Sequence, residues 1–121
     1  MKKLPTILLL SILSPATFSQ LRIMSFESKQ HIGDSVRVDG ITVFTEHKLK
    51  EKSTWVYFGS KPPLQHLTVI VPDADLDNFP GPLKTLFTNR ISIVIGKIVL
   101  LQKHAVIIAH NFKSFAPAPG Q

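Results

Sequence analysis

Ile91-Ser-Ile-Val-Ile-Gly-Lys-Ile-Val-Leu-Leu101 is an apolar, β-branched run with a glycine, Gly96, near its middle. Such runs are typical of buried strands, and a glycine inside a strand marks a sharp bend or the close approach of another backbone. The run is the fourth of five short β-runs between Gly40 and His110, and one short helical stretch lies between the third and the fourth. This order predicts a mainly β protein, a small five-stranded barrel with a short helix between strands 3 and 4.

The segments between these runs carry residues that interrupt β-structure. The strands are expected at 35–44, 54–59, 65–71, 91–101 and 105–111. Residues 45–53 are charged and have little apolar content, which predicts a solvated loop. After Pro72, Asp73 is placed to cap a short helix over 74–79, and 83–87 can form one further turn. The helical part of the chain is thus expected only between strands 3 and 4.

Alternation along the strands assigns side chains to two faces. On the second strand it points Val56 and Phe58 inward, and Trp55 and Tyr57 outward. The third strand is read in the same way, with His66 and Thr68 on its outer face. The residues expected in the core include Val38, Phe58, Val69 and Ile95.

Residues 1–19 have a pattern of their own. Lys2 and Lys3 precede an apolar run that ends at Leu13, and mostly small residues follow up to Ser19. This layout is typical of a cleaved secretory leader, and the run is shorter than the ~20 residues that a membrane-spanning helix needs. We therefore expect a signal peptide at 1–19, cleavage before Gln20, and an exported protein that is periplasmic or secreted.

The rest of the chain is long enough for one domain. We expect an N-terminal arm at 20–30, the barrel domain at 31–113, and a disordered tail rich in proline and alanine at 114–121. Fourteen Lys and Arg against eight Asp and Glu give a charge of +6, and loss of Lys2 and Lys3 lowers it by two. Cysteine is absent, which excludes disulfides, thiolate metal sites and cysteine nucleophiles.

Several short motifs follow one another in a fixed order. They are Ile32-Gly-Asp34, Val36-Arg-Val-Asp-Gly40, Thr54-Trp-Val-Tyr-Phe-Gly59, Pro63-Leu-Gln-His-Leu-Thr-Val-Ile70 and Ile95-Gly-Lys-Ile98. Together, over about 31–112, they resemble small exported bacterial proteins and nuclease-associated domains with an oligonucleotide/oligosaccharide-binding (OB) fold of the nucleic-acid-binding type. The resemblance implies an OB-fold barrel and a binding function.

The chain departs from this pattern at four positions. Relatives commonly carry cysteines where this sequence has Asp39 and Ile93, so it cannot form any bridge that those cysteines imply. Tyr57 and Leu64 each replace an asparagine of the pattern. A binding role cannot be carried over from relatives at these positions.

The exposed strand face suggests a ligand. Barrels of this kind bind single-stranded nucleic acid with aromatic side chains that stack on bases and basic groups that follow the phosphates. The candidate binding residues are Trp55, Tyr57, Arg37, Lys61, His66 and Thr68. In an alternative interpretation the two aromatic side chains only cover one end of the barrel or pack on the N-terminal arm, and the basic residues are ordinary solvated surface.

No motif predicts a metal site, a cofactor or an enzyme. Asp73-Ala-Asp-Leu-Asp-Asn78 lacks the glycine of an EF-hand loop at its sixth position and has Lys84 where the bidentate glutamate belongs. The five histidines have no paired metal-ligand spacing, and a nucleophile elbow and a P-loop are both absent from the sequence. We expect a protein that binds and does not catalyse.

These observations favour an exported OB-fold protein that binds single-stranded nucleic acid through its barrel face. Two alternatives stay open on the sequence alone. One is a protein-interaction or accessory module that docks on an envelope protein. The other is a binder of oligosaccharides or small ligands.

Overall fold

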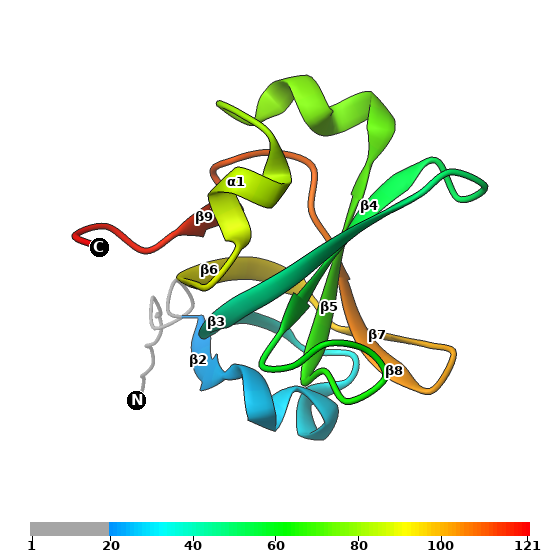
Figure 1. Ribbon diagram of the computed structural model, residues 1–121. Helices are drawn as coiled ribbons and strands as arrows, with labels where there is room; N and C mark the ends of the chain where they lie inside the picture. Colours follow the sequence, from blue (N-terminus) through cyan, green and yellow to red (C-terminus); the bar gives the residue numbers. More distant parts are fainter. Residues whose placement is uncertain (1–19) are drawn as a thin grey trace, which may run out of the picture.

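A single twisted sheet organises the chain. The computed structural model describes residues 20–121, so the predicted signal peptide lies outside the described residues. The strands are β2 (Leu21–Met24), β3 (Ser35–Lys48), β4 (Ser53–Phe58), β5 (Leu67–Pro72), β6 (Arg90–Lys97), β7 (Val99–Leu101), β8 (His104–Ile108) and β9 (Phe115–Pro117). Three short helices complete the fold, η3 (Ser25–His31), η4 (Asp73–Asn78) and α1 (Leu83–Phe87). Figure 1 shows η3 at one end of the sheet, and η4 and α1 at the other.

The mainly β class is confirmed, but the predicted five-stranded barrel is not. The strands form an open sheet of eight, in the order β7-β8-β5-β4-β3-β6-β9, with β2 paired to β3 outside this path. Strands β2 and β9 come from segments predicted as arm and tail. The predicted fourth strand divides at Ile98 into β6, which pairs with β3, and β7, which pairs with β8. The helical segment lies between β5 and β6, as the sequence predicts.

Strand β3 extends further than its composition suggests. Residues Ser35 to Thr42 pair with β6, and Thr42 to Lys48 pair with β4, with an irregularity between Thr42 and Phe44. The predicted loop at 45–53 is therefore wrong for its first part, and only a short turn separates β3 from β4. The charged composition of residues 45–48 is typical of a loop and not of a strand. These residues form a strand because β4 supplies their backbone hydrogen bonds, and composition does not predict this pairing.

Alternation predicts most of the core correctly. Val38, Phe58 and Val69 are fully buried. Ile95 is only partly buried, because it lies opposite Arg37 on the outer side of β6, and Val94 and Ile98 fill the core instead. The prediction for Ile95 is wrong by one residue, and a slip of one residue moves a side chain to the other face of a sheet.

The C-terminal segment is ordered, which corrects the predicted disordered tail at 114–121. Phe115 is fully buried and its ring stacks on that of Phe87, with 3.9 Å between the centroids. Strand β9 pairs with β6, and the Gln121 amide donates a hydrogen bond to the carbonyl oxygen of Ile91 at 2.7 Å. One buried aromatic residue and a free strand edge are sufficient to hold this proline-rich segment.

Two glycines permit close approach between elements. A Cβ on Gly40 would lie 2.5 Å from the Ser25 hydroxyl oxygen, so the glycine lets η3 pack against β3. A Cβ on Gly96 would lie 2.8 Å from the Ile107 side chain, which brings β8 close to β6. Both distances are shorter than a real Cβ contact allows, so both positions require glycine for steric reasons.

The short helix η4 is held differently from the prediction. Asp73 does not cap it, and Pro72 precedes it without a side-chain cap. The Asp73 carboxylate instead accepts a hydrogen bond from His47 Nε2 at 3.0 Å, which links η4 to the end of β3. Within residues 20–121, no helix is long and apolar enough to cross a membrane.

The buried position of Val69 leads to a stability prediction. Val69→Ala removes two methyl groups from a fully buried site and should lower the free energy of unfolding by about 1 to 3 kcal/mol in urea titrations. Val99→Ala is the matched control, because Val99 is 38% exposed and should tolerate the same change with little effect. Equal losses in the two variants would contradict the assignment of β5 to the core.

Candidate nucleic-acid interface

The outer face of β3, β4, β5 and β8 carries two rows of side chains that run across the strands. Phe44, Tyr57, Thr68 and Val106 are register partners in the first row. Glu46, Trp55, Ile70 and Ile108 are register partners in the second. We call this surface the aromatic face and define it by Phe44, Glu46, Lys48, Trp55, Tyr57, Lys61, Ile70 and Ile108.

Trp55 lies on the predicted side of β4 and is partly exposed. Its indole nitrogen donates a hydrogen bond to the Ser53 hydroxyl at 2.9 Å. The Lys48 ammonium lies 4.4 Å from the ring centroid, within the range of a cation–π contact. The indole ring is therefore held in place and has a positive charge beside it.

Tyr57 does not lie in the position that the sequence predicts for a base-stacking residue. Its side chain is 2% exposed, it stacks on Phe44 at 6.1 Å, and its hydroxyl donates to Glu46 at 2.9 Å. Burial, and then the nearby Glu46 carboxylate, raise the pKa of Tyr57 well above its usual value. Tyr57 supports the face from beneath by packing on β3, and the partly exposed ring beside it is Phe44.

The two residues predicted on the outer face of the third strand, His66 and Thr68, are not accessible at the aromatic face. Thr68 is 1% exposed and accepts a hydrogen bond from the Gln65 amide at 3.1 Å, so it cannot contact a ligand. His66 is exposed, but its ring lies 3.3 Å from the Ser25 hydroxyl and meets Phe26 edge to face. His66 thus belongs to the surface near η3 and not to the aromatic face.

Lys61 does lie at the aromatic face. Its ammonium is 5.1 Å from the centroid of Phe44, in the same arrangement as Lys48 over Trp55. Of the six predicted residues, the structure leaves Trp55 and Lys61 accessible at the aromatic face, and Tyr57 is buried beneath it. The structure adds Phe44 and Lys48, which the sequence reasoning missed because they fall at or beyond the predicted end of the first strand. Alternation continued from Val36 and Val38 would have pointed residues 44, 46 and 48 inward, and the irregularity between Thr42 and Phe44 reverses this assignment.

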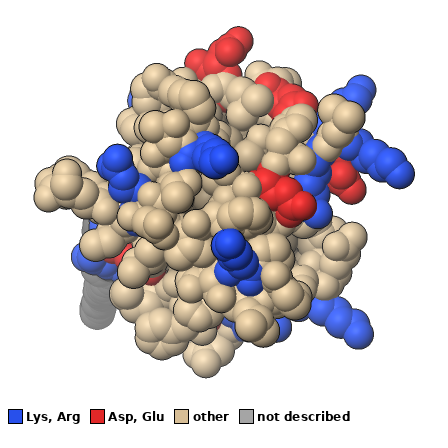
Figure 2. All heavy atoms as spheres, in the orientation of Figure 1, with Lys and Arg blue, Asp and Glu red and all other residues tan. Residues whose placement is uncertain are grey.

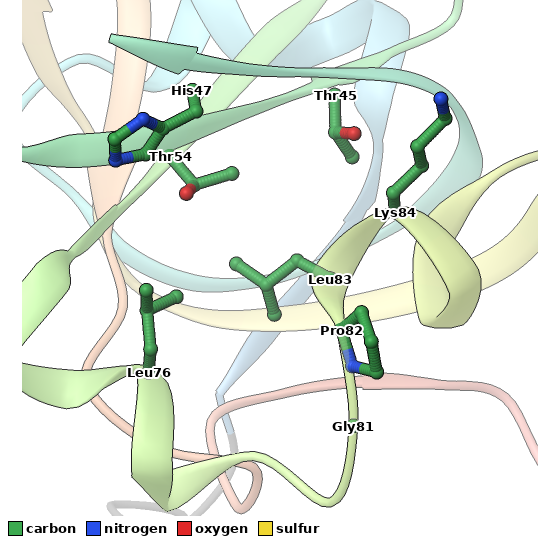
Figure 3. A pocket seen from close by; sticks show the side chains of 8 residues that line it. All are labelled: Thr45, His47, Thr54, Leu76, Gly81, Pro82, Leu83 and Lys84. Atoms are coloured by element: carbon green, nitrogen blue, oxygen red, sulfur yellow. The ribbon is translucent and has the colours of Figure 1, made fainter. Parts of the chain in front are cut away.

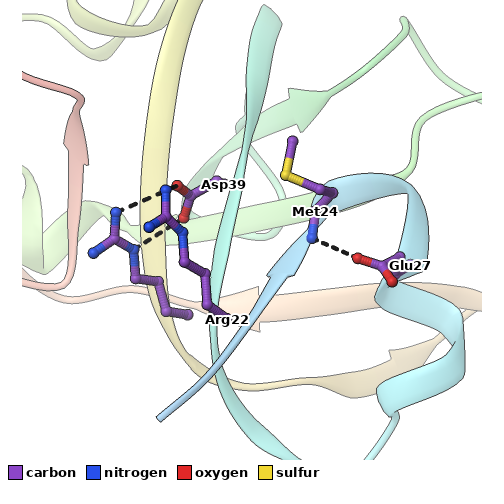
Figure 4. Close-up of polar contacts among 5 residues, drawn as sticks. Arg22, Met24, Glu27 and Asp39 are labelled. Carbon is purple, nitrogen blue, oxygen red and sulfur yellow. Dashed lines mark hydrogen bonds and ion pairs between the residues drawn. The ribbon is translucent and has the colours of Figure 1, made fainter. Parts of the chain in front are cut away.

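Arg37 lies elsewhere on β3 and is already paired. Its guanidinium donates to Asp39 at 3.0 Å, and Arg22 from β2 donates to the same carboxylate at 2.8 Å (Figure 4). Arg37 faces Ile95 of β6, whereas Trp55 faces Glu46 near the other end of β3. The predicted position of Arg37 beside Trp55 is wrong. Arg37 and Glu46, the partner of Trp55, lie near opposite ends of the long strand β3.

Asp39, the acceptor of both arginines, lies inside the sheet between β2 and β6. Asp39 and Ile93 are direct cross-strand partners on β3 and β6. Burial opposes the ionisation of Asp39, but the hydrogen bonds and charges of Arg37 and Arg22 outweigh it and lower the pKa of Asp39. Two arginines around one carboxylate therefore link β2 to β3 at this place in the sheet.

The lowered pKa of Asp39 predicts a pH-dependent contribution to stability. Because its folded pKa lies below the unfolded value of about 3.9, the contribution is complete above that value and is lost as the pH falls through the folded pKa. Urea unfolding should show Asp39→Asn less stable than the parent at pH 7, with the difference shrinking below about pH 4. Asp77→Asn serves as the control, since Asp77 has no ion pair within residues 20–121. A difference that stays constant across this pH range would contradict the prediction.

On the face of the described chain that Figure 2 shows, basic side chains are scattered and do not form one large patch. Lys48, Lys50 and Lys52 lie at and beside the turn between β3 and β4, where Glu51 also lies. Figure 2 shows basic and acidic side chains together at the right edge of the view, where Figure 1 places this turn. In the described part of the chain, no group of three His, Cys, Asp or Glu could hold a metal ion.

Comparison with known proteins supports the fold alone. No family model matches the sequence, and no curated protein matches it. A crystal structure assigned to an aspartyl-tRNA synthetase from Leishmania major Friedlin is similar, with a TM-score of 0.55 and 10% sequence identity. The match covers 83% of this chain and 21% of that one, so the chain spans about a fifth of the length of the protein it resembles.

Proposed function

We propose that this protein is an exported OB-fold binding protein that takes single-stranded nucleic acid on its aromatic face. The observation that carries the proposal is the pair of partly exposed rings, Trp55 and Phe44, each with a lysine ammonium over one of its faces. Bases stack on such rings whatever their sequence, and lysines beside them can contact the phosphates between stacked bases.

The strand pairing supports the OB assignment within the proposal. Strands β3, β4 and β5 are consecutive and antiparallel, and β5 pairs in parallel with β8. The segment formed by β6 and β7 contacts β3 at one end and β8 at the other. This order of five units supports the OB assignment that we propose, with β2 and β9 added at the edges.

The position of the face agrees with this assignment. OB folds bind oligonucleotides on the face of their second and third strands and on the loops beside it. Here those strands are β4 and β5, which carry Trp55 and Ile70 on their outer side. The similar solved structure is named for an enzyme of tRNA, which is consistent with a nucleic-acid ligand.

The proposal is tested by titrating Trp55 fluorescence with a single-stranded oligonucleotide at two salt concentrations. Trp55 is the only tryptophan, so its emission reports directly on the face. We expect saturable quenching, with an affinity that falls as salt rises, because bound lysines release counterions. Unchanged emission at saturating oligonucleotide, with the circular dichroism spectrum intact, would refute stacking at this face.

Variants separate the two kinds of contact. With a labelled oligonucleotide, Trp55→Ala and Phe44→Ala should each cost about 1 to 3 kcal/mol of binding free energy with little change in salt slope. Lys61→Gln should weaken binding and also reduce the slope by about 0.7. Lys97→Gln is the control, because Lys97 lies at the end of β6 opposite Ser35, away from the face.

A second candidate function is docking on an envelope protein. Val99, Leu100 and Leu101 form the edge strand β7, and all three are exposed apolar residues, at 38%, 60% and 40%. An exposed apolar edge can accept a strand from another protein. Absence of oligonucleotide binding in the fluorescence titration would favour this candidate.

Export is part of the proposal and has its own test. Strand β2 begins at Leu21, so cleavage before Gln20 would leave every strand of the sheet intact. N-terminal sequencing of the native protein should give Gln20 as the first residue, from a fraction outside the cytoplasm. Recovery of Met1 from the cytosolic fraction would contradict export.

A further inference from the structure

A cavity opens on the opposite side of the β3–β4 ribbon from the aromatic face. It has a volume of about 400 Å³ and lies between the ribbon, η4 and the start of α1. Figure 3 shows Thr45, His47 and Thr54 along one wall, with Leu76 and Leu83 across from them. The short helices η4 and α1 supply the apolar side of the cavity.

The polar wall consists of side chains at inward positions. Thr45 lies opposite Val56, and His47 lies opposite Thr54, so alternation points them to the same side as the core. At this end of the sheet the side chains of Thr45, His47 and Thr54 line the cavity and do not pack into the apolar core. Thr45 and Thr54 make no side-chain hydrogen bond within residues 20–121, and Thr54 is 9% exposed.

The Thr54 hydroxyl still reaches open space. The only side-chain polar atom in the described chain that is fully buried without a partner is Gln65 Oε1, so the unpaired Thr54 hydroxyl is not fully buried. The space available to a residue this buried is the cavity, so the hydroxyl can donate to a group placed there. An unpaired hydroxyl beside a cavity of this size favours a polar ligand atom in it.

The lysine among the lining residues is Lys84. It lies at the rim of the cavity and has no acidic partner within residues 20–121. Asp73 lies nearby, but its carboxylate is engaged by His47 at 3.0 Å, and no Asp or Glu lines the cavity itself. The lining therefore offers hydroxyl and ammonium donors without a competing carboxylate.

The remaining wall is apolar and sets the shape of the ligand. Leu76 from η4 and Leu83 from α1 face the polar wall across the cavity (Figure 3). The volume lies at the lower end of the range for small-molecule pockets. We propose that this cavity binds a small organic anion, with its charged head at Thr45, Thr54 and Lys84 and a short apolar body against the two leucines.

The site is tested by ¹H–¹⁵N spectra of the protein during titration with hexanoate, hexyl phosphate and 1-hexanol. Hexanoate and hexyl phosphate should shift the amides at the end of β3, the start of β4, η4 and α1, with a Kd of about a millimolar. The tighter of the two identifies the headgroup. The neutral 1-hexanol should bind at least about tenfold more weakly.

Two variants make the test specific. Lys84→Gln at an exposed position should weaken hexanoate about threefold to tenfold, and Thr54→Val, which replaces the hydroxyl with a methyl group of similar size, should weaken it about fivefold. Lys97→Gln should leave the affinity unchanged. If 1-hexanol binds as well as hexanoate, if Lys84→Gln has no effect, or if neither anion shifts these amides, the proposal is overturned. Failure of oligonucleotide binding would not affect it, because the two surfaces lie on opposite sides of the ribbon.

Discussion

The rest of the structure depends on the continuity of β3. This strand pairs with β2 and β6 through its first half and with β4 through its second half, so one stretch of backbone joins both parts of the sheet. The irregularity between Thr42 and Phe44 and the absence of a side chain at Gly40 let the strand bend where the partners change. A break in β3 would separate β6 and β9 from the remaining strands.

The second half of β3 and the whole of β4 form a ribbon that presents different chemistry on its two sides. Side chains at 44, 46 and 48 form the aromatic face with Trp55, whereas Thr45, His47 and Thr54 line the cavity. Because successive side chains of a strand point to opposite faces, two neighbouring surfaces arise from the same few residues. Small changes in register would therefore alter both surfaces together.

Asp39 joins neighbouring strands through charge. It is the cross-strand partner of Ile93 on β6. Arg22 and Arg37 converge on the Asp39 carboxylate from neighbouring strands. Partly exposed ion pairs of this kind stabilise weakly and depend on pH and salt, unlike a covalent bridge.

The sequence by itself determined the mainly β class, the position of the helical segment and most of the inward residues. These follow from local patterns, because alternation and breaking residues act within a few positions of the chain. The inward positions of Val38, Phe58 and Val69 needed no knowledge of distant partners.

Only the tertiary structure decided which outer residues are accessible and which strands pair. Tyr57 and Trp55 have the same alternation, yet Phe44 and Glu46 cover Tyr57, and Trp55 is left partly exposed. Arg37 and Trp55 are assigned to the same face by the pattern, but Arg37 lies in the first half of β3, whereas Trp55 of β4 pairs with the second half. Phe115 orders a tail whose composition favours disorder. In each case the deciding contact joins residues far apart in sequence, and a pattern read along the chain contains no information on such contacts.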